Sequence, residues 1–298
     1  MSSHPNRALL YTLIALMQVF WSANFLVGKA ALREFPAPLL ASLRVVLAGL
    51  IILPVILPIY AARTRGAGAT VRRDLPMFAL LALVGVAVNQ FCFVIGLGLT
   101  SVAHSALIIG MAPIWVLLLG AWRGLERITA RKLAGMLVAL AGVAVLNLER
   151  ASGPGPTVAG DLITAVAGIC FAIYTIRGKE IQHRHGTFTV NAITFALGGL
   201  FLLPVAVWQG STFRFAEVSA AGWMGALYMA VFPSLACYLI FYYALGYISP
   251  VRLSTLAYLQ PVVATLGGAL LLGERVSAAL LAGGAIILGG VYLTERGR

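Results

Sequence analysis

The chain has 298 residues, of which 61% are hydrophobic and 10% charged, and its formal net charge is +12. A soluble domain carries roughly 25% charged residues, so this composition excludes an ordinary water-soluble protein. The basic residues flank apolar runs, which argues against a nucleic-acid partner and favours charge placed beside a lipid bilayer.

The apolar runs predict ten membrane-spanning helices. A spanning helix needs about 20 mostly apolar residues. The first run is too long for the core of a signal peptide and is expected to be retained. The gaps between runs are short, so no soluble domain is expected. The predicted spans are 8–27, 38–60, 76–97, 100–122, 132–148, 158–176, 189–208, 220–243, 250–272 and 277–294.

Lysine and arginine are distributed unevenly between the two sides of this predicted bundle. Ten spans place both termini on one side, and that side carries 15 Lys and Arg residues against 5 on the other. Cytoplasmic loops of membrane proteins carry the excess of positive charge. We therefore expect both termini to be cytoplasmic.

The sequence repeats itself. Residues 101–145 align with residues 249–293 at an offset of 148 without a gap, and Gly28-Lys29 meets Gly178-Lys179 at an offset of 150. This predicts an all-α protein with two repeats, residues 1–150 and 151–298. Five helices are an odd number, so the second repeat is expected to enter the membrane from the opposite side. Inverted repeats of this kind place a substrate where the halves meet.

Three segments resemble the EamA-type branch of the drug/metabolite transporter superfamily. They are FWSANFLVGKAAL at 20–32, ASLRVVLAG at 41–49 and FYYALGYISPVRLSTLAYLQPVVATLGGALLLGERVS at 241–277. The first repeat departs from the pattern, with Arg123 and Gly124 where the second has Leu271 and Leu272. The resemblance implies a ten-helix exporter in a bacterial inner membrane. Members typically export amino acids or other small metabolites, and some move sugars, nucleotides or drug-like cations.

Polar and aromatic residues recur inside the predicted spans. At the repeat offsets Asn24 meets Tyr174, and Gln90 meets Tyr238. A cavity between the repeats would need such groups to replace a substrate's hydration. Each one could instead make an interhelical hydrogen bond, worth about 0.6 kcal/mol on average. The candidate substrate-binding residues are Gln18, Trp21, Asn24, Arg44, Gln90, Tyr174, Tyr238, Tyr258 and Gln260.

Arg44 is the one strong base well inside a predicted span. An arginine at the centre of a spanning helix costs about 2.5 to 3.5 kcal/mol on insertion scales. One interpretation is a counter-charge for a substrate carboxylate or for a gate. The other is a side chain that reaches the membrane surface and pairs with carbonyl groups or with Glu34.

Other residues have two interpretations each. Pro113 and Pro261 predict paired kinks, which are either hinges for alternating access or static bends. His104 either couples transport to protons or faces an aqueous vestibule, since histidine changes charge near neutral pH. Recurring glycines such as Gly135 and Gly142 predict close helix packing, within the chain or in a homodimer. Glu126 and Glu274 each precede an expected helix N-cap, Thr129 and Ser277.

Several chemistries lack their sequence signatures. The chain has no P-loop, no HExxH motif and no CxxC pair, and its carboxylates lie at span edges or in loops. We therefore expect no metal and no cofactor. The leading hypothesis is a secondary exporter of small metabolites, most simply amino acids or related zwitterions. The alternatives are an exporter of amphipathic cations and, from other classes, a membrane enzyme acting on lipid or prenyl groups or a membrane sensor or scaffold without transport.

Overall fold

A computed structural model describes residues 6–63, 68–147, 157–260, 262 and 278–296. In the described part of the first half, the elements are α1 (Arg7–Ala31), α2 (Ala37–Arg63), α3 (Gly68–Arg73), α4 (Leu75–Leu80), η1 (Leu81–Val88), α5 (Asn89–Leu99), α6 (Val102–Ile109), α7 (Ala112–Trp122) and α8 (Ala130–Asn147). Those of the second half are α9 (Val158–His185), α10 (Thr187–Gly210), η2 (Phe215–Glu217), α11 (Ala220–Met229), η3 (Ala230–Ala236), α12 (Cys237–Leu245), α13 (Pro250–Thr255), η4 (Leu256–Tyr258) and α15 (Ala278–Glu295).

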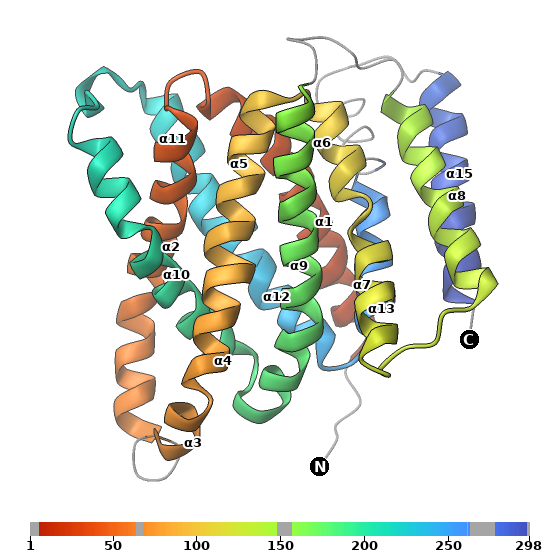
Figure 1. The fold of residues 1–298 in the computed structure, drawn as a ribbon, viewed down its shortest axis with the longest axis horizontal. Helices are drawn as coiled ribbons and strands as arrows, with labels where there is room; N and C mark the ends of the chain where they lie inside the picture. Colours follow the sequence, from red (N-terminus) through yellow and green to blue (C-terminus); the bar gives the residue numbers. More distant parts are fainter. Residues whose placement is uncertain (1–5, 64–67, 148–156, 261, 263–277, 297–298) are drawn as a thin grey trace.

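The described residues form helices without strands, arranged as one bundle (Figure 1). Seven helical stretches among them are long and apolar enough to cross a membrane. Predicted spans 132–148 and 277–294 correspond to α8 and α15, while most of span 250–272 lies outside the described residues. The structure therefore gives a multi-helix membrane protein, and the count of ten remains a prediction.

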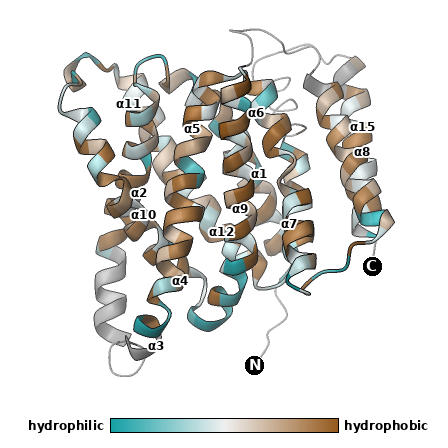
Figure 2. Cartoon of the chain, viewed as in Figure 1, coloured by the Kyte–Doolittle hydropathy of each residue, from teal (hydrophilic) through white to brown (hydrophobic). Residues whose placement is uncertain are grey.

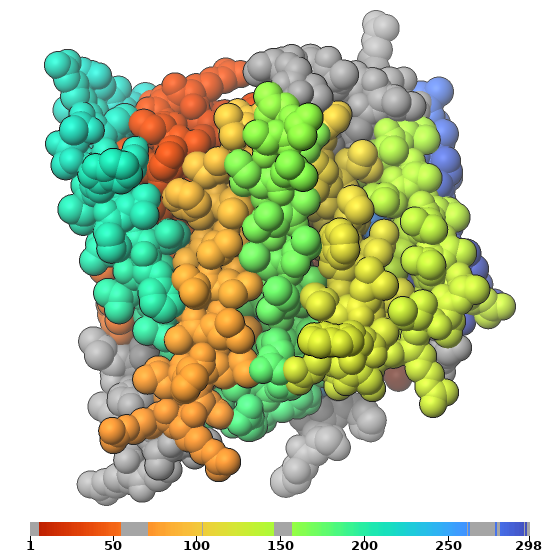
Figure 3. Space-filling view, viewed as in Figure 1, coloured from red at the N-terminus to blue at the C-terminus, as the bar shows by residue number. Residues whose placement is uncertain are grey.

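The helices run side by side from one end of the bundle to the other. Figure 2 shows apolar residues along their lengths and hydrophilic residues gathered towards the helix ends. The space-filling view places α10, α5, α9, α7 and α8 next to one another across one face (Figure 3). The first described turn of α1 and the last of α15 lie at the same end of the bundle, the lower end in Figure 1.

α9 is longer than the sequence predicts. The predicted span ends at residue 176, but the helix continues to His185 and ends at Gly186, whose φ is +79°. Charges in these last turns pair at helical spacing, since Arg177 Nη1 lies 3.9 Å from Glu180 Oε2. Such pairs stabilise an exposed helical turn, so the helix projects beyond its apolar span. The predicted N-cap at Thr129 is confirmed, because its Oγ1 accepts from the Lys132 N–H at 3.2 Å.

Each half contains a π-helical segment at the same place in the repeat. η1 spans Leu81–Val88 and η3 spans Ala230–Ala236, which match at the offset of 148. Both interrupt an otherwise α-helical stretch. Single π turns inside α-helices occur frequently at functional sites. Here a cavity-lining residue, described below, follows each within two positions, Asn89 after η1 and Tyr238 after η3.

Glycines allow two close helix pairs to form between the halves. A Cβ atom on Gly49 of α2 would lie 3.5 Å from the Gly199 Cα of α10, and one on Gly199 would lie 3.6 Å from the Gly49 Cα. On α8 and α15, a Cβ on Gly135 would lie 2.7 Å from the Gly290 oxygen and one on Gly290 would lie 2.6 Å from the Gly135 oxygen. These glycines pack within the chain, as one of the two sequence interpretations predicts.

Candidate functional site

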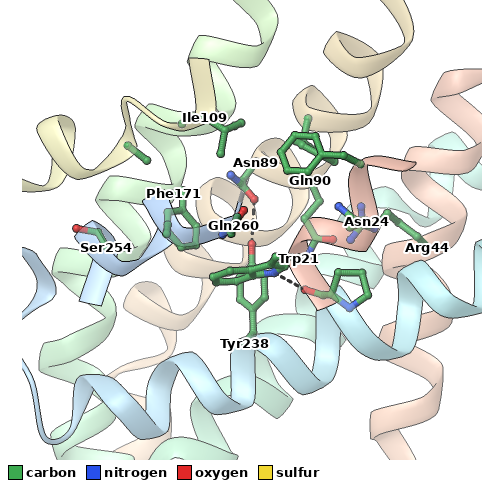
Figure 4. A pocket seen from close by; sticks show the side chains of 16 residues that line it. Trp21, Asn24, Arg44, Asn89, Gln90, Ile109, Phe171, Tyr238, Ser254 and Gln260 are labelled. Atoms are coloured by element: carbon green, nitrogen blue, oxygen red, sulfur yellow. Dashed lines mark hydrogen bonds between the residues drawn. The ribbon is translucent and has the colours of Figure 1, made fainter. Parts of the chain in front are cut away.

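A cavity lies between helices of both halves, with about 700 Å³ of empty space including the part open to its surroundings. Its walls come from α1, α2, α5, α6, α7, α9, α12, η3, α13 and the residues after it (Figure 4). The lining residues are Trp21, Asn24, Phe25, Arg44, Asn89, Gln90, Phe93, Ile109, Ala112, Gly168, Phe171, Pro233, Tyr238, Ser254, Ala257 and Gln260.

One end of the cavity is polar and holds Arg44. This side chain is 2% exposed. Its Nη2 donates to Ser234 Oγ at 3.0 Å and to the Met229 carbonyl at 3.3 Å. Nε and Nη1 have no hydrogen-bond partner among the described residues. Glu34, the alternative partner weighed from sequence, instead accepts from the Ser219 N–H and Oγ at 2.7 and 2.8 Å.

Neighbouring amides extend this polar end. Gln90 Oε1 accepts from Ser234 Oγ at 2.9 Å, while Gln90 Nε2 and Asn24 Oδ1 have no partner in the described part of the chain. Buried polar groups are normally hydrogen-bonded. Together with Arg44, they offer unpaired donors and one unpaired acceptor beside the cavity.

The other end is aromatic. The rings of Trp21, Phe171 and Tyr238 meet edge to face, with centroids 5.8 to 6.3 Å apart. Trp21 Nε1 donates to the Pro233 carbonyl at 3.0 Å, and Tyr238 OH donates to Asn89 Oδ1 at 3.0 Å; Figure 4 draws both bonds. Because these polar tips are already bonded, the rings present mainly apolar surface to the cavity.

Six of the predicted substrate-binding residues line this cavity: Trp21, Asn24, Arg44, Gln90, Tyr238 and Gln260. Three do not, namely Gln18, Tyr174 and Tyr258, all of which are buried in packing. Tyr174 OH lies 3.3 Å from Thr194 Oγ1, and its ring occupies the space beside Gly85, where a Cβ would come within 1.8 Å of its Cδ2.

Ten lining residues were not among the candidates, Phe171 among them, and neither was Ser234, which contacts Arg44 without lining the cavity. Ser234 is buried and joins Arg44 to Gln90, but a lone serine inside an apolar helix carries no sequence signal of such contacts. Phe171 lines the aromatic end, and a signal for it existed, because it meets the predicted Trp21 at the repeat offset of 150.

The expected kink at Pro113 is present as a break in the helix. α6 ends at Ile109 and α7 begins at Ala112, with Pro113 in its first turn. Proline fits there because its missing N–H would have no helical partner. Pro261 lies outside the described residues, so the paired hinge remains a prediction.

His104 has an acidic neighbour that the sequence placed only at a span edge. Its Nδ1 lies 3.2 Å from Asp161 Oδ2, and Thr100 Oγ1 donates to Asp161 Oδ1 at 2.7 Å. Both side chains are partly exposed, 45% for His104 and 32% for Asp161. Among the residues that the structure describes, no group of three or more His, Cys, Asp or Glu could hold a metal ion.

Comparison with known proteins identifies the family to which this chain belongs. The sequence profile of the EamA-like transporter family matches residues 8–148 and again residues 158–296. The chain belongs to the EamA-like transporter family. It is a membrane transporter and not an enzyme.

Curated relatives of similar length extend the comparison. An uncharacterized transporter of Archaeoglobus fulgidus is 28% identical, over 95% of this chain and 96% of the relative. A probable amino-acid metabolite efflux pump of Salmonella typhimurium is 28% identical, over 96% and 94%. A probable terminal-alkyne amino-acid exporter of Streptantibioticus cattleyicolor is 27% identical, over 95% and 92%. A crystal structure at 22% identity superposes with a TM-score of 0.73 over 96% of both chains, which shows the fold.

Proposed function

We propose that this protein is a secondary transporter that exports small metabolites carrying a carboxylate, with amino acids and related zwitterions as its substrates. The observation that carries the proposal is Arg44, a buried guanidinium at the cavity, whose Nε and Nη1 have no hydrogen-bond partner in the part of the chain that the structure describes. An arginine buried in a membrane protein pairs with a charged group or with carbonyls, and the Met229 carbonyl engages only Nη2, so Nε and Nη1 still need a partner. A substrate carboxylate would supply that partner.

The other unpaired groups fit a zwitterion. Gln90 Nε2 can donate to the same carboxylate, and Asn24 Oδ1 can accept from an ammonium group. The aromatic rings would cover an apolar side chain. Amphipathic cations, the alternative from sequence, fit less well because a buried guanidinium repels them. Two of the relatives are named as a probable amino-acid exporter and a probable amino-acid metabolite efflux pump, which supports the proposed substrate class.

The proposed mechanism is alternating access between two inverted five-helix repeats, in a bacterial inner membrane with cytoplasmic termini. The reciprocal glycine contacts and the matching π segments support a two-fold relation between the halves.

The His104–Asp161 pair is our candidate for proton coupling. If it couples, uptake driven by a pH gradient should be lost in His104→Gln, while exchange at equal pH continues.

Ligand-dependent stabilisation of the purified protein tests the substrate class. A ligand that binds the native state raises its melting temperature. We expect L-leucine to stabilise the wild type more than L-leucinamide, which lacks the carboxylate. Arg44→Ala should weaken L-leucine binding about 100-fold, as loss of charge-assisted hydrogen bonds implies, and leave L-leucinamide binding nearly unchanged.

The control is Arg214→Ala, which removes an exposed arginine that is paired with Glu217 and does not line the cavity. It should preserve the preference for the acid. Equal losses for acid and amide in Arg44→Ala would reject carboxylate recognition by Arg44. Absence of stabilisation by any amino acid in a complete panel, confirmed by absence of flux in liposomes, would reject the substrate class.

A further inference from the structure

Both anchored side chains at the ends of the cavity are held by the same short segment, η3 and the residue before it. Arg44 of α2 contacts Met229 and Ser234, and Trp21 of α1 contacts Pro233. We propose, on the basis of the function proposed above, that η3 positions Arg44 and Trp21 for substrate through two backbone carbonyl groups and one hydroxyl group.

Pro233 accounts for the Arg44 contact. In an α-helix the N–H of residue 233 would donate to the carbonyl of Met229, but proline has no N–H. The segment takes π pitch there, and the Met229 carbonyl lies 2.7 Å from Ser234 Oγ and accepts from Arg44 Nη2 at 3.3 Å. The carbonyl therefore holds the guanidinium across a helix interface.

Ser234 fixes the orientation of Arg44 and Gln90 together. Its hydroxyl lies 3.0 Å from Arg44 Nη2 and 2.9 Å from Gln90 Oε1. A guanidinium has five N–H donors in one plane, so holding Nη2 orients the remaining donors. The groups left unpaired on Nε and Nη1 are those we assign to the substrate carboxylate.

The carbonyl of Pro233 accounts for the Trp21 contact. Its α-helical donor would be the N–H of Cys237, but that N–H bonds to the carbonyls of Phe232 and Ser234 instead. A carbonyl left without its helical donor is open to a side chain. The Trp21 indole fills that place at 3.0 Å, which fixes the ring that forms one wall of the aromatic end.

η1, the counterpart of η3 in the first repeat, lacks the anchoring residues of η3. At Pro233 and Ser234 it has Gly85 and Val86, and at Trp21 the counterpart is Phe171, which has no N–H to donate. The backbone is otherwise alike, since Asn89 N–H bonds to the carbonyls of Val84 and Val86. The π turn is thus shared by both repeats, whereas the anchoring groups belong to η3.

Fluorine NMR of the full-length protein labelled with 5-fluorotryptophan tests the Trp21 contact. The chain has five tryptophans, and loss of one resonance in Trp21→Phe assigns Trp21. We expect Pro233→Ala to shift the Trp21 resonance, because the restored N–H competes with Arg44 and Ser234 for the Met229 carbonyl and so alters the segment whose residue-233 carbonyl holds the indole. Pro204→Ala, at an exposed position inside α10, should leave it in place. An unshifted Trp21 resonance in Pro233→Ala would overturn the positioning of Trp21.

The preference for L-leucine over L-leucinamide tests the Arg44 contact. Ser234→Ala should reduce that preference about tenfold, as expected for one hydrogen bond to a charged group, without moving the Trp21 resonance. Ser234→Thr should restore it. Ser42→Ala, whose hydroxyl lies within hydrogen-bond distance of the Pro38 and Leu39 carbonyls of its own helix, should change neither quantity.

The outcomes separate the two proposals. If Arg44→Ala abolishes the acid preference and Ser234→Ala preserves it, η3 does not position Arg44, and the carboxylate function stands. If Arg44→Ala preserves the preference, the carboxylate function fails. The Trp21 resonance then decides by itself whether η3 positions the aromatic end.

Discussion

The carboxylate of Asp74 joins the start of α4 to the end of α9. Arg184 Nη1 donates to both of its oxygens at 2.7 and 2.9 Å, and His185 Nε2 lies 2.7 Å from Oδ2. The hydrogen bond with His185 lowers the pKa of Asp74 most, and the charge of Arg184 lowers it further, while burial acts in the opposite direction. The carboxylate is therefore favoured in its ionised form.

This shift makes the stability of the protein depend on pH. A carboxyl group whose pKa is lower in the folded state stabilises the fold above its unfolded pKa, about 3.9, and loses that contribution as pH falls through the folded value. Asp74→Asn should lower the free energy of unfolding by about 1.5 kcal/mol at neutral pH. Melting curves of the two proteins should converge as the pH falls through the folded pKa of Asp74. Glu217→Gln, in an exposed pair with Arg214, should have little effect at any pH.

For individual residues, the sequence predicted which buried side chains are polar better than it predicted which of them face the cavity. Arg44, Asn24 and Gln90 could be identified as candidates because a polar group inside an apolar span costs free energy unless it is paired or serves a function. Tyr174 obeys the same rule, yet its hydroxyl finds Thr194 inside the packing. Whether a buried polar group faces a cavity or a neighbouring helix depends on how its own helix is rotated about its axis. The sequence does not determine that rotation when every face of the helix is apolar.

At the scale of elements, the π segments shape the cavity and were not predicted. The sequence LALVGVAV of η1 is apolar throughout, so a change in helical pitch leaves no trace in its hydrophobic pattern. Gly85 has a visible consequence nevertheless. The ring of Tyr174, which is fully buried, occupies the place where a side chain at Gly85 would lie.

Gly85→Ala should therefore destabilise the protein. The atoms in the way are the Cβ, Cγ and Cδ2 of Tyr174, and the base of a side chain cannot move aside without its helix. Overpacking of this kind typically costs 1 to 3 kcal/mol, about 2 here. Gly98→Ala on α5 is the matched control, since its nearest neighbour would be the Ala37 Cβ at 3.5 Å. Equal melting temperatures for the two variants would contradict the packing of Tyr174 against η1.

On the scale of the whole molecule, the two halves meet through equivalent residues. Gly49 and Gly199 are counterparts at the offset of 150 and touch each other, and Gly135 meets Gly290 as Gly142 meets Gly283. Reciprocal contacts of this kind are what a two-fold axis between the halves produces. The repeat could be predicted from sequence because close helix pairs require glycine at fixed positions.

Opposite membrane orientation of the halves predicts opposite accessibility for counterparts. Arg33 follows α1, and His183 lies near the end of α9; both are exposed and match at the offset of 150. In a background with Cys92, Cys170 and Cys237 replaced by alanine, Arg33→Cys should react with a membrane-impermeant maleimide in intact cells. His183→Cys should react only after the membrane is opened. Labelling of both from the same side would mean that the halves are parallel, and alternating access between inverted repeats would then be wrong for this protein.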